Sequence, residues 1–140
     1  MSTTLTQEDM QMLALLEKST GAVGRDVLVS EDGIAFIVKP GDVGKVIGKG
    51  GSNIKKLREL LGKTVDVVED NETVQGFVRN LFTPASITDV TLHEIDGKKS
   101  VQVKVDPAQK GLAIGKGGER AKRARRLAKR RFDIDDLKIS

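Results

Sequence analysis

The stretch that decides the fold is Val46-Ile47-Gly48-Lys49-Gly50-Gly51-Ser52-Asn53-Ile54, and its centre returns as Ala113-Ile114-Gly115-Lys116-Gly117-Gly118-Glu119-Arg120-Ala121. Aligning Gly48 with Gly115 sets an offset of 115 − 48 = 67 residues. Kept without a gap, this offset aligns apolar residues on both sides of the stretch: Ile34 with Val101, Leu57 with Ala124, Leu60 with Leu127, Val65 with Phe132, and Val67 with Ile134. A repeat of this length predicts a duplicated structural unit.

The length of the chain bounds the number of domains. Its 140 residues could form one ordinary domain or two small ones, and the repeat favours two. We predict domain boundaries at residues 1–70 and 71–140, with residues 69–72 as the link. Residues 1–5 are expected to be an irregular start.

The first half is predicted to have the order α-β-β-α-α-β. Thr6 is a helix cap, and the helix it begins should end near Gly21 or Gly24. The remaining elements are expected as strands over residues 26–30 and 34–38, a short helix over 41–48, a helix over 54–61 and a strand over 64–68. Spacing predicts that the last helix carries one apolar face, formed by Ile54, Leu57, Leu60 and Leu61.

The second half repeats this order. A helix over residues 74–81 has apolar residues at i, i+3, i+4 and i+7, and strands are expected over 87–95 and 101–105. A short helix, the second glycine loop and a long basic helix follow, and residues 133–139 supply the last strand. Ala121, Ala124 and Ala128, three and four residues apart, predict close packing of one face of the basic helix.

Composition excludes several kinds of site. There is no cysteine and only one histidine, His93, with no carboxylate cluster at ligand spacing around it. We therefore predict no metal site, no cofactor and no enzymatic activity. Because no basic segment precedes an apolar run and no stretch of 18 apolar residues occurs, we expect a cytoplasmic protein, not a membrane protein.

Positive charge gathers in one segment of the second half. Lys110 to Arg131 holds ten Lys and Arg residues and one Glu, so its charge is 10 − 1 = +9 in a chain of net charge +4. The rest of the chain is therefore mildly acidic, at 4 − 9 = −5. Such a distribution indicates a surface that binds a polyanion. The alternatives are a merely solvated basic helix and a helix that enters the major groove of DNA.

Both glycine loops have the composition of a phosphate-binding turn. Glycine tolerates positive φ and has no Cβ to hold a ligand away, and the start of the following helix favours an anion. Lys49 and Lys116 add a mobile cation at each tip. The spacing of the glycines fits neither a Walker loop nor a dinucleotide-binding fingerprint. The alternative to a phosphate-binding role is a simple turn between helices.

With these residues in this order of elements, each half resembles a KH domain of the type II topology. The resemblance implies an α+β fold of two tandem α-β-β-α-α-β domains, each a three-stranded sheet with helices packed on one face. In KH domains the Gly-x-x-Gly loop clamps the backbone of about four nucleotides, and the resemblance implies the same role for both loops of this chain. The tandem pair is similar to the short archaeal members of the NusA transcription factor family.

Carried over residue by residue, the resemblance implies an RNA-binding site in each half. The backbone contacts fall to the loops Gly48-Lys49-Gly50-Gly51 and Gly115-Lys116-Gly117-Gly118, and the apolar floor to Ile47, Ile54 and Ile114. Ala121 departs from the expected Ile, which favours phosphate attraction over base contact in the second half. Basic residues beside the loops complete the predicted site: Lys55, Arg120, Lys122 and Arg123.

The predicted function is therefore that of a monomeric transcription elongation or termination factor. Both loops are expected to hold one nascent single-stranded RNA, with RNA polymerase as a further partner. Single-stranded RNA is favoured because there is no Tyr or Trp, and Phe36, Phe77 and Phe132 occupy apparent core positions. Phe82 remains undecided. The alternative is a structural or protein-docking module associated with RNA polymerase or the ribosome.

Overall fold

A computed structural model describes residues 5–140, so the expected irregular start lies, apart from Leu5, outside the described residues. The described chain forms two compact units, residues 5–70 and residues 71–140, which we call the first unit and the second unit. Each combines helices with one three-stranded sheet, which confirms the predicted α+β class. Within residues 5–140, no helix is long and apolar enough to cross a bilayer.

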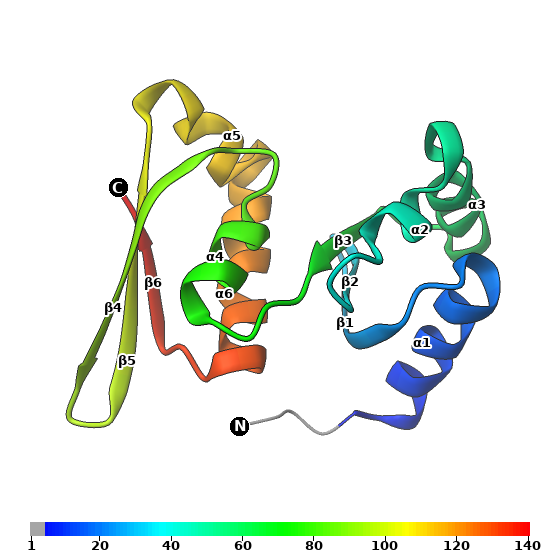
Figure 1. The fold of residues 1–140 in the computed structure, drawn as a ribbon, viewed down its shortest axis with the longest axis horizontal. Coiled ribbons are helices and arrows are strands. Elements are labelled where there is room, and N and C mark those ends of the chain that lie inside the picture. Colours follow the sequence, from blue (N-terminus) through cyan, green and yellow to red (C-terminus); the bar gives the residue numbers. More distant parts are fainter. Residues whose placement is uncertain (1–4) are drawn as a thin grey trace. The chain divides into compact units, whose positions relative to one another are not determined.

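The first unit has the predicted order of elements (Figure 1). They are α1 (Gln7–Thr20), β1 (Gly24–Ser30), β2 (Gly33–Val38), α2 (Val43–Ile47), α3 (Ser52–Leu61) and β3 (Val65–Glu69). The sheet order is β1-β2-β3, with β1 antiparallel and β3 parallel to the central strand. The crossover from β2 to β3 consists of α2, the glycine loop and α3, so the topology itself places the loop between two helices.

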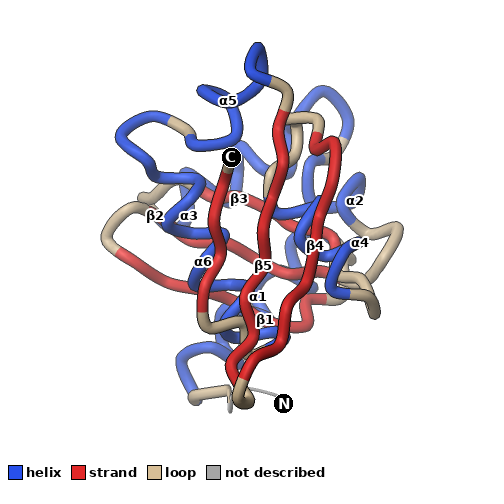
Figure 2. The backbone as a smooth tube through the Cα atoms, turned by 90° about the vertical axis from the view of Figure 1, so that its left-hand side faces the viewer, coloured by secondary structure: helices blue, strands red, loops and turns tan. Residues whose placement is uncertain are grey.

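The second unit repeats this arrangement. Its elements are α4 (Val74–Leu81), β4 (Ile87–Ile95), β5 (Lys98–Val105), α5 (Lys110–Ile114), α6 (Glu119–Phe132) and β6 (Asp136–Ile139). The sheet order β4-β5-β6 again joins an antiparallel pair to a parallel one. Figure 2 shows these three strands side by side on the face that α4 and α6 do not cover.

Local sequence fixes the ends of the first helix as predicted. The Thr6 hydroxyl accepts a hydrogen bond from the Asp9 amide, and the Asp9 carboxylate accepts one from the Thr6 amide, forming a capping box. Gly21 ends the helix at φ 78°, a left-handed conformation that glycine adopts without strain.

The helical faces are confirmed in the second unit but only in part in the first. Ala121, Ala124 and Ala128 are buried as predicted, and α6 packs against α4, α5 and β6. In the first unit Leu57 is fully buried, whereas Leu60 is 66% exposed, so its predicted place on the apolar face is wrong. Leu60 stands one residue before the end of α3, where little structure lies beside it.

The ungapped alignment holds through the ten residues of α3 and fails at the last strand of each unit. Because α6 has 14 residues and α3 has 10, the last strand begins later in the second unit. Val65 pairs with Ile34, and the residue that pairs with the equivalent Val101 is Leu137. Val65 therefore corresponds to Leu137, not to Phe132, and Val67 corresponds to Ile139, not to Ile134. The last strand covers only Asp136–Ile139 because Asp133 ends α6 at φ 57°.

Candidate nucleic-acid interface

The two glycine loops have the same backbone conformation. In the first loop, φ and ψ are 73° and 175° at Gly48, 62° and 21° at Gly50, and 79° and 15° at Gly51. The corresponding glycines, Gly115, Gly117 and Gly118, have 80° and 170°, 63° and 19°, and 76° and 12°. All φ values lie in the region that L side chains rarely adopt. Each loop is thus a tight turn between two helices, not a continuous helix.

The first glycine of each loop is packed, whereas the last two are open. A Cβ on Gly48 would lie 2.7 Å from Asn53 Cγ, and one on Gly115 would lie 2.9 Å from Arg120 Cβ. At Gly50, Gly51, Gly117 and Gly118 an added Cβ would meet nothing within 4 Å. The first glycine therefore lets the loop close on the following helix, and the other two leave bare backbone at the surface.

A side chain five residues after the first glycine braces each loop. Asn53 Nδ2 donates a 2.9 Å hydrogen bond to the Lys45 carbonyl, and Arg120 Nη1 donates to the equivalent Leu112 carbonyl. Arg120 Nε is buried without a partner among the described residues. This contact of Asn53 was not predicted from the sequence, although the position of Asn53 relative to Gly48 repeats that of Arg120 relative to Gly115.

The predicted basic residues belong to the loops or to the first turns of the helices that follow them. Lys49, Lys55, Lys116 and Lys122 are exposed, and their side chains have no ion pair or hydrogen bond within residues 5–140. Arg123 is half-buried and has an interaction of its own. The free ammonium groups beside open backbone give each loop the charge that a phosphate requires.

The predicted apolar floor differs between the units. Ile47 is 39% exposed, while Ile54 is partly buried and packs against the core that contains Leu57. In the second unit Ile114 is partly buried and Ala121 is 4% exposed. The second unit instead exposes Leu112 by 43%, at the position where the first has Lys45. Leu112 was not predicted as part of the site, since the equivalent residue of the other repeat, Lys45, is not apolar.

A side chain before each loop ties the start of the short helix to the residue that precedes the first strand of the same unit. Asp42 Oδ2 accepts a 2.8 Å hydrogen bond from the Val23 amide, and Gln109 Oε1 accepts a 2.9 Å bond from the Ser86 amide. The Val23 amide, followed by the charge of Lys45, holds the pKa of Asp42 below its usual value. These contacts fix the helix that leads into each loop.

Among residues 5–140, no aromatic ring is fully exposed. Phe36, Phe77 and Phe82 are fully buried, and Phe132 is half-buried, with its ring centroid 5.6 Å from that of Phe77. These are all four Phe residues of the chain, which has no Tyr or Trp. Phe82, undecided from sequence, is thus part of the core. The described residues therefore provide no exposed ring on which a base could stack.

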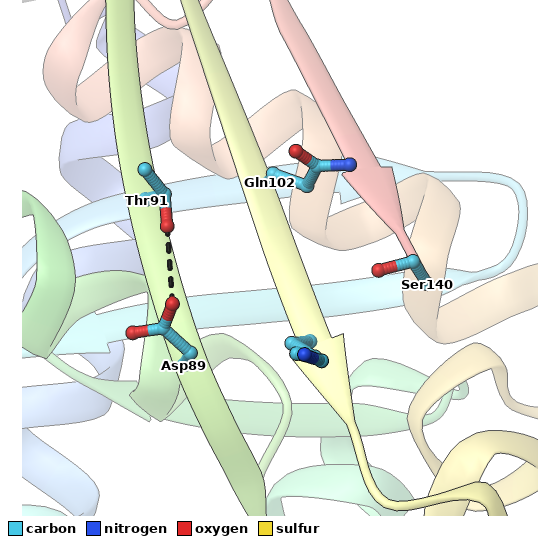
Figure 3. Close-up of a pocket in the computed structure, with 5 residues that line it drawn as sticks. Asp89, Thr91, Gln102 and Ser140 are labelled. Atoms are coloured by element: carbon cyan, nitrogen blue, oxygen red, sulfur yellow. Dashed lines mark hydrogen bonds between the residues drawn. The ribbon is translucent and has the colours of Figure 1, made fainter.

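One further hollow, of about 270 Å³, lies on the face of the second sheet that carries exposed side chains of β4 and β5. Asp89, Thr91, Gln102, Lys104 and Ser140 line it, and the Thr91 hydroxyl donates a 3.1 Å hydrogen bond to Asp89 (Figure 3). Lys104 is the one cationic residue among them, and the carboxylate of Asp89 would repel a bound anion. Within residues 5–140, no group of His, Asp or Glu side chains is arranged to hold a metal ion.

Comparison with known proteins gives two family matches. The KH domain model matches residues 13–84, and a model described as the NusA-like second KH domain matches residues 74–140. Together they cover both glycine loops.

Curated relatives match the chain over nearly its whole length. A protein of Halococcus morrhuae named "Probable transcription termination protein NusA" is 39% identical over 140 residues, which is 100% of both chains. A protein of the same name from Methanocaldococcus jannaschii is 33% identical over 135 residues, 96% of this chain and 74% of the relative. A solved crystal structure of a protein called APE1850 has a TM-score of 0.89 and 36% identity, covering 97% of this chain and 100% of that one.

Proposed function

The chain belongs to the family of tandem KH proteins named as probable transcription termination protein NusA, and from this premise we propose that it binds single-stranded RNA through both Gly-x-x-Gly loops. The RNA is the nascent transcript, and binding acts on elongation or termination by RNA polymerase in the cytoplasm. The relatives are named as termination proteins and not as enzymes, so we propose binding without catalysis. We place the boundary between the KH domains at Asp70 and Asn71.

The observation that carries this proposal is the open backbone at Gly50 and Gly51, repeated at Gly117 and Gly118. A sugar-phosphate chain can approach such a backbone closely because no side chain intervenes. The loops lead directly into α3 and α6, whose first amide groups favour an anion, and Lys49 and Lys116 are free to pair with phosphate. This mode of binding requires no exposed aromatic side chain.

The experiment is a titration of fluorescently labelled single-stranded RNA with loop variants of the full chain. Lys49→Asp/Gly50→Asp and Lys116→Asp/Gly117→Asp should each weaken binding about tenfold or more, because each replaces a phosphate contact with repulsion. Circular dichroism should remain that of the parent. Unchanged affinity in both variants would refute the proposal.

A matched control is available on α1. Lys18→Asp/Gly21→Asp makes the same changes of residue type and charge, at a glycine with φ 78° and nothing within 4 Å of an added Cβ. RNA affinity should stay close to that of the parent. If this variant weakened binding as much as the loop variants, net charge and not the loops would control affinity.

Salt dependence tests the rival function of a structural or protein-docking module. Binding through phosphates should weaken as salt rises, with a slope in log-log form of about −0.7 for each contact to a single strand. A protein in which the loops serve only as turns would show no such loss on loop mutation. RNA bound in cells, crosslinked and sequenced, would identify the transcript segment.

A further inference from the structure

We propose that the RNA held by the second loop continues along the solvent-facing side of α6, where Lys122 and Arg126 bind its phosphates. This inference rests on the proposed function and extends it, since it makes the site of the second unit longer than the Gly-x-x-Gly clamp. We call Lys122 and Arg126 the α6 track.

Most of the cations that make α6 so basic are already engaged. Arg125 Nε donates to the Leu137 carbonyl at 3.0 Å, and Lys129 pairs with Asp133 at 2.8 Å and with Asp135 at 2.9 Å. Arg131 donates to the Asn71 carbonyl and lies 4.3 Å above the Phe132 ring. Arg120 braces the loop, and Arg123 and Arg130 also have partners. These contacts hold the unit together and leave a smaller set for a ligand.

Lys122 and Arg126 are exposed and have no ion pair or hydrogen bond within the described part of the chain. They are four residues apart, so one lies above the other on the same side of the helix, about 6 Å apart along its axis. This side is opposite to the buried Ala124 and Ala128. The separation is comparable to that of neighbouring phosphates in an extended nucleotide chain.

Along the chain, the track follows the cation at the loop tip. Lys116 stands at the loop tip, Lys122 in the first turns of α6 and Arg126 one turn further. Free cations along a helix that starts at a backbone clamp fit a polyanion that leaves the clamp over that helix.

An acidic protein is the other class of partner, and the surface argues against it. The large apolar side chains exposed among residues 5–140 are Met10, Val23, Ile47, Leu60, Leu92, Ile95 and Leu112, and none is on α6. Protein interfaces need such anchors at their centre, whereas phosphate contacts do not. RNA is therefore the occupant that this face fits.

The first unit supplies the internal comparison. At the offset of 67 residues, Lys55 corresponds to Lys122, but Glu59 stands where the second unit has Arg126. The solvent side of α3 thus lacks the second cation. A track exists in only one of two otherwise similar sites.

The test measures binding of the full chain to two single-stranded RNAs, one of four nucleotides, the length a KH loop clamps, and one about three times as long. Lys122→Glu/Arg126→Glu should weaken the long RNA about tenfold and reduce its salt slope by about 1.4, two contacts at about 0.7 each. Affinity for the short RNA should fall much less, because four nucleotides clamped at the loop do not extend as far as Arg126. Lys122→Gln/Arg126→Gln should give a smaller loss of the same pattern.

The control places the same charge change on the open face of the second sheet. Lys98→Glu/Lys104→Glu reverses two exposed lysines of β5 and should leave both RNAs bound as before. In the first unit, Glu59→Arg should strengthen binding of the long RNA. Circular dichroism checks that each variant is folded.

Three results would overturn the inference: equal loss for short and long RNA, equal loss in the β5 control, or no loss for the long RNA in the track variants. The last would leave the acidic protein as the partner to seek. Failure of the proposed function looks different, because the short RNA would then stay bound even when Lys49→Asp/Gly50→Asp and Lys116→Asp/Gly117→Asp are combined in one chain.

Discussion

The side-chain amide of Asn53 spans the first glycine loop and donates a 2.9 Å hydrogen bond to the carbonyl of Lys45. The bond joins α3 to α2 across the turn that contains Gly50 and Gly51. Arg120 makes the corresponding contact with Leu112 in the second unit. The same contact is thus made in the two units by side chains of different length and charge.

This equivalence predicts that the shorter side chain can replace the longer one. Arg120→Asn should fold with a stability within about 1 kcal/mol of the parent, because the brace to Leu112 is kept and the buried Nε is removed. Arg120→Ala should lose about 1–2 kcal/mol, since the Leu112 carbonyl loses its donor. Urea unfolding measures both, and equal losses would contradict the brace.

Within one loop, two glycines should respond differently to alanine. Gly48→Ala places a methyl group 2.7 Å from Asn53 and should cost about 3 kcal/mol or more, by strain and by steric overlap. Gly50→Ala meets open space and should cost only about 1–2 kcal/mol for its positive φ. Thermal unfolding of both variants gives the order, and a reversed order would contradict the packing.

The first residue of α6 should limit phosphate binding by the second loop. Glu119 begins α6, whereas Ser52 begins α3, so a carboxylate stands beside the second loop only. Glu119→Ser should raise affinity for short single-stranded RNA about two- to fivefold at low salt, because a like charge is removed near the phosphate. Ser52→Glu should lower affinity in the first unit. RNA titration in low and high salt checks both signs.

Acid should weaken the contact between Asp42 and Val23. The pKa of Asp42 is lowered in the folded chain, so its contribution to stability is present above the ordinary value of 3.8 and is lost as pH falls through the folded value. Asp42→Asn should therefore flatten part of the pH dependence of unfolding below about pH 4. Gln109→Glu, which introduces the titration in the second unit, should steepen it. Unfolding in urea at several pH values measures both.

Leu60 and Leu127 were aligned from sequence, yet only Leu127 should matter for stability. Leu127→Ala leaves a cavity and should cost about 2–5 kcal/mol. Leu60→Ala changes a side chain that is 66% exposed and should fall within about 0.5 kcal/mol of the parent. A large loss at Leu60 in chemical unfolding would show that it is covered in solution.

That pair shows where sequence reasoning succeeded and where it could not. The repeat, glycine loops and turn residues are local signals, and they predicted the order of elements in both units. The side that a neighbour covers is not local. In the second unit α4 lies along α6, and Phe77 contacts Phe132 in the added turn, while α3 ends at Leu61. An alignment without gaps could not reveal the extra helical turn of α6.

The site was predictable to a similar depth. Glycine spacing identified the loops, and the single cations at their tips followed. Which cations were free could not be predicted, because the partners of Arg125 and Lys129 lie in β6 and in the segment that precedes it. Lys129 has its pKa raised to about 12 by Asp133 and Asp135, so a residue counted toward a binding surface serves the fold instead.

The packed glycines also bear on inheritance. Every missense change at the codon for Gly48 or Gly115 adds at least one carbon atom where Asn53 or Arg120 already stands. No amino acid is smaller than glycine, so every such substitution introduces a steric overlap. A descendant protein that kept the loop conformation would therefore need a second, compensating mutation elsewhere.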